Sequence, residues 1–159
     1  MRARAYPIRR THGNHFQMND HFADHFSPVS GDYARYRPTY PVALFAWLAK
    51  QVTSHNLAWD CAAGSGQASR DLTRYFKRII ATDASSAQIA AAAPYPGTEY
   101  RVAPAEASGL SEASVDLITV AQAMHWFDLD RFYAEARRVL KPGGILAAWC
   151  YGVLSVEGE

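Results

Sequence analysis

The sequence predicts an α/β protein built on one doubly wound parallel sheet, and three observations support this. Short apolar segments alternate with amphipathic ones from residue 56 onward. The glycine-containing segment DCAAGSGQ (60–67) directly follows the first apolar segment, where a strand would turn into a helix. The 159-residue chain, 49% hydrophobic and 19% charged, has room for one domain with a substantial core. Strands that alternate with helices in this way pair in parallel through right-handed crossovers.

Five strands are expected, each a short apolar run bounded by turn or loop residues. They cover residues 56–60, 78–83, 98–103, 115–120 and 145–150. The first helix is predicted over 41–53, ahead of the first strand, and the second over 68–76. Ser85 and Asp128 are expected to cap two further helices, because their side chains can accept from the first backbone N–H groups. KPGG (141–144) is expected to break the last helix before the fifth strand.

The expected strand order is 3-2-1-4-5. In such sheets ligands bind beyond the carboxyl ends of the strands, next to the point where strand order reverses, and Asp60 and Asp83 should project there. One strand would separate Cys61 from Cys150, so they would lie about 9.6 Å apart. A disulfide requires about 7 Å or less. Both cysteines are therefore expected to be free thiols, which suits a reducing, cytoplasmic location.

Composition excludes several partner classes. A formal net charge of +1 offers no broad basic surface for nucleic acid, and no apolar run reaches the roughly 18 residues that a membrane helix needs. The basic start lacks the apolar stretch of a secretion signal. Residues 1–25 are expected to form a largely disordered tail and residues 26–159 the domain. His21 and His25, with Asp24 adjacent, lack a third distant ligand, so no metal site is expected.

The residues around the glycine loop indicate a nucleoside ligand. Gly64 and Gly66 allow close backbone approach at the start of a helix, and Asp83 follows at about the 20-residue distance typical of a ribose-binding acid. Asp60 decides between nucleosides, because a carboxylate beside this loop disfavours an anionic pyrophosphate and favours a ligand with ammonium and sulfonium charges. Ser69 stands where a dinucleotide site would place a third glycine or alanine. The pattern therefore favours S-adenosylmethionine over NAD.

The ordered set of motifs resembles the class I S-adenosylmethionine-dependent methyltransferases. It is most similar to the small-molecule branch that includes trans-aconitate methyltransferase-like proteins, with a methyltransferase type 11 domain. This resemblance implies a Rossmann-like fold and covers residues from about 26 to the end of the sequence. The segments that carry it are FSPVSGDYARYRPTYP (26–41), AWDCAAGSGQ (58–67), IIATDASSAQIAAA (79–92), APAEASGL (103–110) and VDLITVAQAMHWFDLDRFYAEARRVLKPGGILAAW (115–149).

The resemblance also implies roles for individual residues. The first motif would hold the methionine part of the cofactor, and the acid after the second strand would bind the ribose hydroxyls. The segment after the third strand would contact the adenine edge through backbone and side chain, and the residue after the fourth strand would line the cofactor from the other side. The cofactor-binding residues expected on this basis are Tyr33, Arg37, Asp60, Gly64, Gly66, Asp83, Ala84, Ala105, Glu106 and Gln122. Packing of the segment 26–41 against the domain would explain Tyr33, Tyr36 and Arg37 equally well.

Two departures from the family pattern stand out. Ala62 occupies a position where the wider family has glycine, and a β-carbon is readily tolerated there only if the backbone φ is negative. Family members also continue beyond the fifth strand, whereas this sequence stops at YGVLSVEGE (151–159). The family's usual last two strands are therefore expected to be missing, which would leave the fifth strand as an edge available for self-association.

The resemblance places AMHWFD (123–128) above the carboxyl end of the fourth strand. His125 could orient a methyl acceptor or take its proton. Alternatively, His125, Trp126 and Phe127 form an aromatic wall that buries the cofactor, and the wall is the favoured interpretation. Trp126 and Tyr36 are assigned to the substrate pocket.

The sequence thus predicts methyl transfer from S-adenosylmethionine to a small molecule, at a carboxylate or hydroxyl oxygen. A carboxylate acceptor would need no catalytic base. The alternatives are an incomplete, inactive S-adenosylmethionine-binding domain and, more distantly, an NAD-dependent oxidoreductase.

Overall fold

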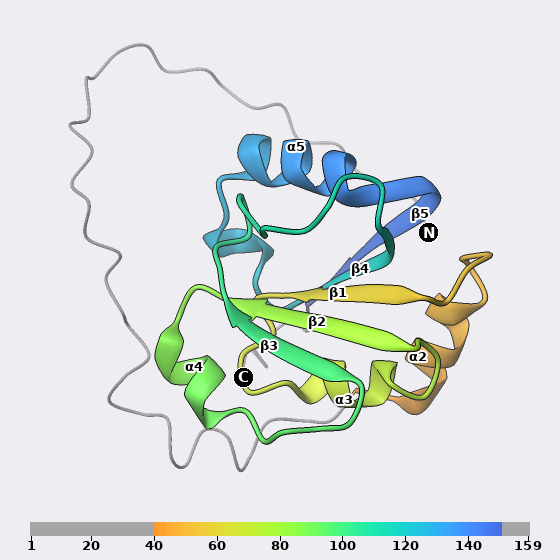
Figure 1. Ribbon diagram of the computed structural model, residues 1–159, viewed down its shortest axis with the longest axis horizontal. Coiled ribbons are helices and arrows are strands. Elements are labelled where there is room, and N and C mark those ends of the chain that lie inside the picture. Colours follow the sequence, from red (N-terminus) through yellow and green to blue (C-terminus); the bar gives the residue numbers. More distant parts are fainter. Residues whose placement is uncertain (1–39, 151–159) are drawn as a thin grey trace, which may run out of the picture.

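The computed structural model describes residues 40–150, and its centre is a five-stranded parallel sheet (Figure 1). The strand order β3-β2-β1-β4-β5 confirms the order predicted from sequence. Cys61, the last residue of β1, and Cys150, which directly follows β5, are free thiols, and β4 lies between these two strands. The strands are β1 (Leu57–Cys61), β2 (Arg78–Asp83), β3 (Thr98–Val102), β4 (Val115–Ala121) and β5 (Leu140–Trp149).

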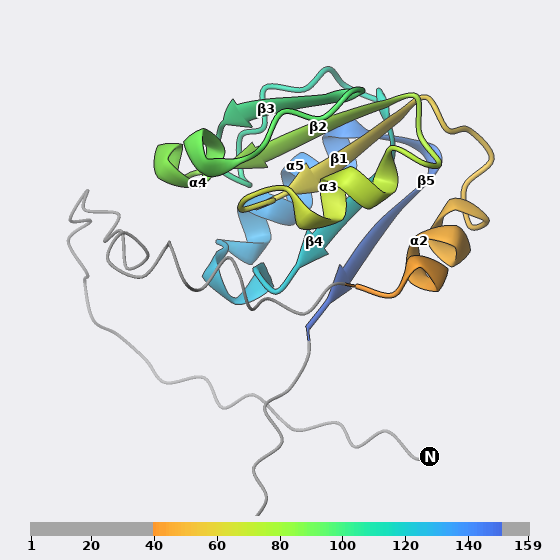
Figure 2. The same ribbon diagram turned by 90° about the horizontal axis from the view of Figure 1, so that it is seen from below.

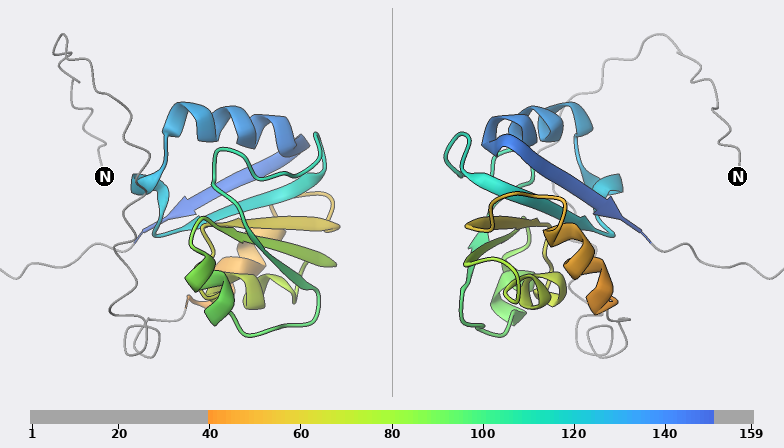
Figure 3. Two further views of the ribbon diagram at one scale, coloured as in Figure 1. Left: turned by 60° about the vertical axis from the view of Figure 1, so that its left-hand side comes forward. Right: turned by 90° about the vertical axis from the view of Figure 1, so that its right-hand side faces the viewer.

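Helices cover both faces of this sheet. Three of them, α2 (Val42–Ala49), α3 (Gln67–Leu72) and α4 (Ser86–Ala91), lie on one face (Figure 2). The other face carries α5 (Leu129–Val139), which follows the short 3₁₀ helix η1 (Met124–Trp126). Figure 3 shows the same division in two further views. The doubly wound arrangement predicted from the alternating pattern is therefore present.

The alternation of side chains along each strand separates two apolar cores. On β1, Trp59 and Cys61 face α5 and pack with Phe132, whereas Ala58 faces α2 and packs with Phe45. These aromatic side chains are fully buried and anchor the two layers. Both faces of β1 are therefore covered, as expected of a central parallel strand.

The structure confirms the two predicted helix caps. The side chain of Ser85 accepts from Gln88 N, and that of Asp128 accepts from Arg131 N. Helix lengths are shorter than predicted, because α2 ends at Ala49 and α3 ends at Leu72. Turns follow both helices, although the apolar spacing continues through them to buried side chains such as Phe76. The spacing correctly identified the buried residues but not where the helical hydrogen bonds end.

α5 ends at Val139, before KPGG, as predicted. The predicted start of the fifth strand at residue 145 was wrong, because the four residues of KPGG already belong to β5, which begins at Leu140. Their pairing with β4 is irregular, because Val115 pairs with Leu140 while Leu117 pairs with Ile145. A proline is tolerated because β5 is an edge strand of the described sheet. Lys141 Nζ also donates to Asp116 Oδ1 at 2.7 Å, which ties this irregular part to β4.

None of the helices between residues 40 and 150 combines the length and apolar character needed to cross a bilayer.

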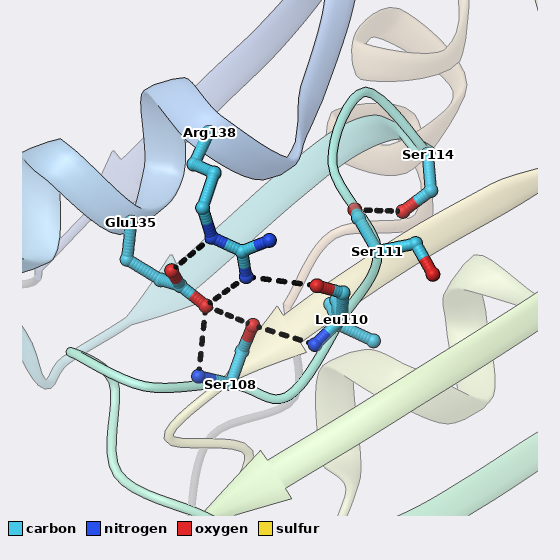
Figure 4. A network of polar contacts seen from close by, with 6 residues as sticks. All are labelled: Ser108, Leu110, Ser111, Ser114, Glu135 and Arg138. Atoms are coloured by element: carbon cyan, nitrogen blue, oxygen red, sulfur yellow. Dashed lines mark hydrogen bonds and ion pairs between the residues drawn. The ribbon is translucent and has the colours of Figure 1, made fainter.

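A charged network fixes the segment that joins β3 to β4 (Figure 4). Glu135 of α5 accepts from Ser108 N at 2.9 Å and Ser108 Oγ at 2.5 Å, and from Arg138 Nε at 2.7 Å. Arg138 also donates to the carbonyl oxygen of Leu110 at 2.8 Å. The hydrogen bonds from Arg138 and then from Ser108 outweigh burial and lower the pKa of Glu135 to about 2. This network attaches residues 108–110 to α5.

We predict that Glu135→Gln destabilises the fold by about 1–3 kcal/mol at neutral pH, because it removes a buried, charge-assisted acceptor. The folded-state pKa of Glu135 is below its ordinary 4.5, so this stabilisation is present above pH 4.5 and is lost as the pH falls toward 2. Urea unfolding of both proteins between pH 2 and pH 7 measures the difference. The gap should narrow with acidification, and a gap that does not change with pH would contradict the network's ionic character. The exposed neighbour Glu112 supplies the control Glu112→Gln, expected to lie within about 0.5 kcal/mol of wild type.

Candidate functional site

The carboxyl ends of β1, β2 and β4 bring the predicted site residues to one edge of the sheet. Asp60 lies near the end of β1, Asp83 ends β2, and Gln122 follows β4. β1 lies between β2 and β4, so these positions belong to neighbouring strands. The edge that the sequence identified from strand order is therefore where these polar residues gather.

Asp60 lies beneath the glycine loop, where two hydroxyl groups hold its carboxylate. Its Oδ2 accepts from Ser69 Oγ of α3 at 2.5 Å, and its Oδ1 accepts from Thr119 Oγ1 of β4 at 2.8 Å. The residue is only 1% exposed. Burial raises the pKa of Asp60 to about 6, the two hydroxyl bonds oppose the rise, and the charge of Asp83 adds to it. In this conformation Asp60 can act on a ligand through its charge and through the loop it supports, rather than by an exposed oxygen.

Asp83 connects the loops that follow β1 and β2. Its Oδ2 accepts from Gly64 N and its Oδ1 accepts from Ser85 N, both at 2.9 Å. The side chain is half-buried, and each carboxylate oxygen has a second lone pair. Asp83 therefore fixes the first glycine of the loop and keeps acceptor capacity for a ligand hydroxyl.

Three carboxylates make this edge electronegative. Burial raises the pKa of the Cys61 thiol well above its ordinary value, and the charges of Asp60, Glu106 and Asp83 raise it further. All three acids therefore act on the end of β1. Such an environment suits a cationic nucleoside and opposes an anionic pyrophosphate. This agrees with the sequence argument that favours S-adenosylmethionine over NAD.

The expected adenine-side residues differ in their exposure. Ala84 is exposed, and Glu106 is half-buried with Oε1 accepting from Asp128 N at 2.9 Å. Ala105 is only 7% exposed, because its methyl group belongs to the core on the α5 face. With its methyl group in the core, Ala105 has its backbone available for the adenine contact expected of this segment.

Gln122 has an unusual environment for an amide. Its backbone is left-handed, with φ 61°, and its N–H donates to the carbonyl oxygen of Trp149 at 2.9 Å. Its Nε2 is buried and has no hydrogen-bond partner among residues 40–150. A strained backbone and an unsatisfied donor together are more typical of functional positions than of structural ones.

His125 and Trp126 lie in η1, between the end of β4 and α5. The centroids of their rings are 4.7 Å apart, and both side chains are exposed, with Trp126 60% exposed. The flanking Met124 and Phe127 pack instead against the core on the α5 face. η1 thus places two exposed rings beside the end of β4.

Comparison with known proteins identifies the family. Residues 59–148, more than half of the chain, match the family model of a methyltransferase domain.

The chain belongs to the methyltransferase domain family.

Several relatives share this methyltransferase domain. A protein of Dictyostelium discoideum named as a methyltransferase by inference is 43% identical over 139 residues, which are 87% of this chain and 53% of that protein. An inferred S-adenosylmethionine-dependent methyltransferase of Saccharomyces cerevisiae is 32% identical over 133 residues, 77% of this chain and 45% of that protein. A solved structure of a proposed type II methyltransferase from Anaeromyxobacter dehalogenans is 52% identical, with a TM-score of 0.72, over 78% of this chain and 53% of that one. The chain therefore spans about half the length of these relatives.

Several predictions for the methyltransferase domain fall outside the described residues. Tyr33, Tyr36 and Arg37 precede residue 40, as do the tail and its histidines. Among residues 40–150, no group of three or more histidine, cysteine, aspartate or glutamate side chains could hold a metal ion.

Sequence reasoning missed the residues that support the loop of this methyltransferase domain. Ser69 was considered only as a departure from a dinucleotide motif, and Thr119 only as part of a strand. Both lie opposite Asp60, and the signal was available: they are hydroxyl residues at otherwise apolar, buried positions. A polar residue inside an apolar strand indicates a buried polar partner.

Ala62 does not satisfy the condition under which alanine is readily tolerated. Its φ is 54°, in the left-handed region, so the β-carbon strains the backbone where the wider family has glycine. The departure found in the sequence is therefore a structural strain within the loop.

We predict that Ala62→Gly stabilises the protein by about 0.5–1 kcal/mol, because glycine adopts positive φ without a steric penalty and this outweighs its larger unfolded-state entropy. Ala63, the next residue, does not have positive φ, so Ala63→Gly should destabilise by a similar amount. Thermal unfolding of the two variants gives the comparison. Destabilisation by both variants would contradict the assignment of strain to Ala62.

Proposed function

We propose that this chain binds S-adenosylmethionine at the carboxyl ends of β1, β2 and β4 and transfers its methyl group to an oxygen of a small-molecule acceptor. The observation that carries the proposal is the cluster of Asp60, Asp83 and Glu106 around a glycine loop in a methyltransferase-family fold. Bound S-adenosylmethionine would supply a methyl group on a positively charged sulfur.

The residues present fit such a ligand. The loop containing Gly64 and Gly66 would lie against the methionine part, and the negative charge of Asp60 beneath it favours an ammonium group. Asp83 has the free lone pairs to accept from ribose hydroxyls. Nε2 of Gln122, which has no partner within the described part of the chain, would donate to an oxygen or nitrogen acceptor of the cofactor.

The exposed rings of η1 would contact the methyl acceptor. Trp126 offers an apolar face beside the end of β4, and the imidazole nitrogens of His125 can donate or accept a hydrogen bond. A carboxylate acceptor is already ionised at neutral pH, so it needs orientation but no base. A hydroxyl acceptor would need one, and His125 is the candidate among the described residues of η1.

The proposal also includes self-association through β5 and a cytoplasmic location. β5 is an edge of the described sheet, and an edge strand presents unpaired backbone groups that a second copy could pair with. The two free thiols suit a reducing cytoplasm.

The proposal is tested by following transfer of a labelled methyl group from S-adenosylmethionine to a panel of small carboxylic acids and alcohols. We expect the labelled products to be methyl esters or ethers. Tight cofactor binding without transfer to any acceptor would instead support the inactive binding domain. Binding of NAD in place of S-adenosylmethionine would support the oxidoreductase.

The same assay decides the role of His125. If His125 belongs to an aromatic wall, His125→Phe keeps the ring and retains turnover, whereas His125→Ala loses part of it. If it is a base, both variants lose about 100-fold or more, and only with hydroxyl acceptors. Equal rates for both variants and wild type would remove His125 from the site.

A further inference from the structure

Tyr100 of β3 lies in the same row of the sheet as Asp60. It pairs with Ala81 of β2, and Ala81 pairs with Asp60 of β1. Side chains at paired positions of parallel strands point to the same face. Because the side chain between them is only a methyl group, the tyrosine ring can extend over Ala81 toward the end of β1.

Gly66 shows where that ring goes. A β-carbon built on Gly66 would collide with the phenol oxygen of Tyr100, the nearest atom, and would lie 2.9 Å from Cε1 and 3.0 Å from Cζ of its ring. The ring therefore occupies the space beside the glycine at the start of α3. Position 66 has two separate requirements for glycine, its φ of 86° and the proximity of Tyr100.

The charge environment of Tyr100 agrees with this placement. Burial raises the pKa of its phenol, and the negative charge of Asp60 raises it further. The ring is thus close both to the acid beneath the loop and to the last glycine of the loop.

We propose that Tyr100 is a positioning residue for the glycine loop: its ring packs against Gly66 and fixes the turn that contacts the methionine part of the cofactor. The other supports of this region are polar, since Gly64 N donates to Asp83 and Ser69 donates to Asp60. Tyr100 adds the packing of an aromatic side chain from the side of β3. The identity of the ligand in this inference rests on the proposed function. The packing of Tyr100 on Gly66 does not depend on that function.

The packing is tested without any ligand. Gly109 also has positive φ, 70°, but a β-carbon there meets nothing within 4 Å, so Gly109→Ala measures backbone strain alone. We expect Gly66→Ala to lower the melting temperature by roughly twice as many degrees as Gly109→Ala. In a Tyr100→Val background, which keeps a good strand former but removes the ring, the excess should disappear. An excess that persists without the ring would overturn the contact.

The positioning role is tested by calorimetric titration with two ligands. S-adenosylhomocysteine carries the methionine-derived part, and 5′-methylthioadenosine carries only the nucleoside part. We expect Tyr100→Val to weaken S-adenosylhomocysteine binding about tenfold and to leave methylthioadenosine binding within about twofold, because only the first ligand uses the loop. Tyr100→Phe, which keeps the ring, should bind both ligands like wild type.

The outcomes separate the two proposals. Equal weakening of both ligands by Tyr100→Val, or no weakening of either, would overturn the positioning role while leaving the proposed function standing. Failure of the wild-type protein to bind either ligand would overturn the proposed function, and the melting experiment would still decide whether Tyr100 packs on Gly66.

Discussion

The buried carboxylate of Asp60 is the interaction on which the site depends. It joins β1 to β4 through Thr119 and to α3 through Ser69. Those three elements surround the loop that would receive a ligand. Hydrogen bonds to a charged group contribute about 1.5–3 kcal/mol each. They also decide where α3 begins relative to the sheet.

This arrangement has a cost at neutral pH. The pKa of Asp60 in the folded protein, about 6, is above its ordinary 3.8, so the folded state binds protons more tightly than the unfolded chain. Stability from this group is therefore fully present below about pH 4 and is lost as the pH rises through 6. The loss amounts to ~3 kcal/mol. A buried carboxylate that destabilises the fold at working pH is more easily explained by a ligand than by structure, since a bound cation would offset part of the cost.

Local patterns predicted most of the fold. β2 has the bounds that its apolar run indicated, and the caps at Ser85 and Asp128 form because their acceptors lie within three residues of the donors they satisfy. Right-handed crossovers allow several strand orders, so the order 3-2-1-4-5 was an expectation for this fold class that the structure confirms. What sequence could not give depends on pairing between distant segments. The early start of β5 requires β4 as a template, and no local signal in KPGG shows that an edge strand will accept it.

In the candidate site, too, local sequence signals predicted some residues, whereas others depend on contacts between distant segments. Asp60 and Asp83 were predicted from their places at strand ends and Gln122 from the family resemblance, and all three lie at the same edge of the sheet. Tyr100 could not be predicted, since its contact with Gly66 depends on register across two strands and on the small side chain at Ala81. The buried state of Asp60 was equally invisible, because it depends on hydroxyl groups from α3 and β4.

The most direct test of this account is the pH dependence of S-adenosylhomocysteine affinity in wild type and Asp60→Asn. If the charge of Asp60 attracts the ligand's ammonium group, wild-type affinity should rise about threefold to tenfold between pH 5 and pH 7. The Asp60→Asn affinity should remain flat across that range. Equal pH profiles for the two proteins would contradict the claim that a buried carboxylate beneath the glycine loop selects a cationic nucleoside.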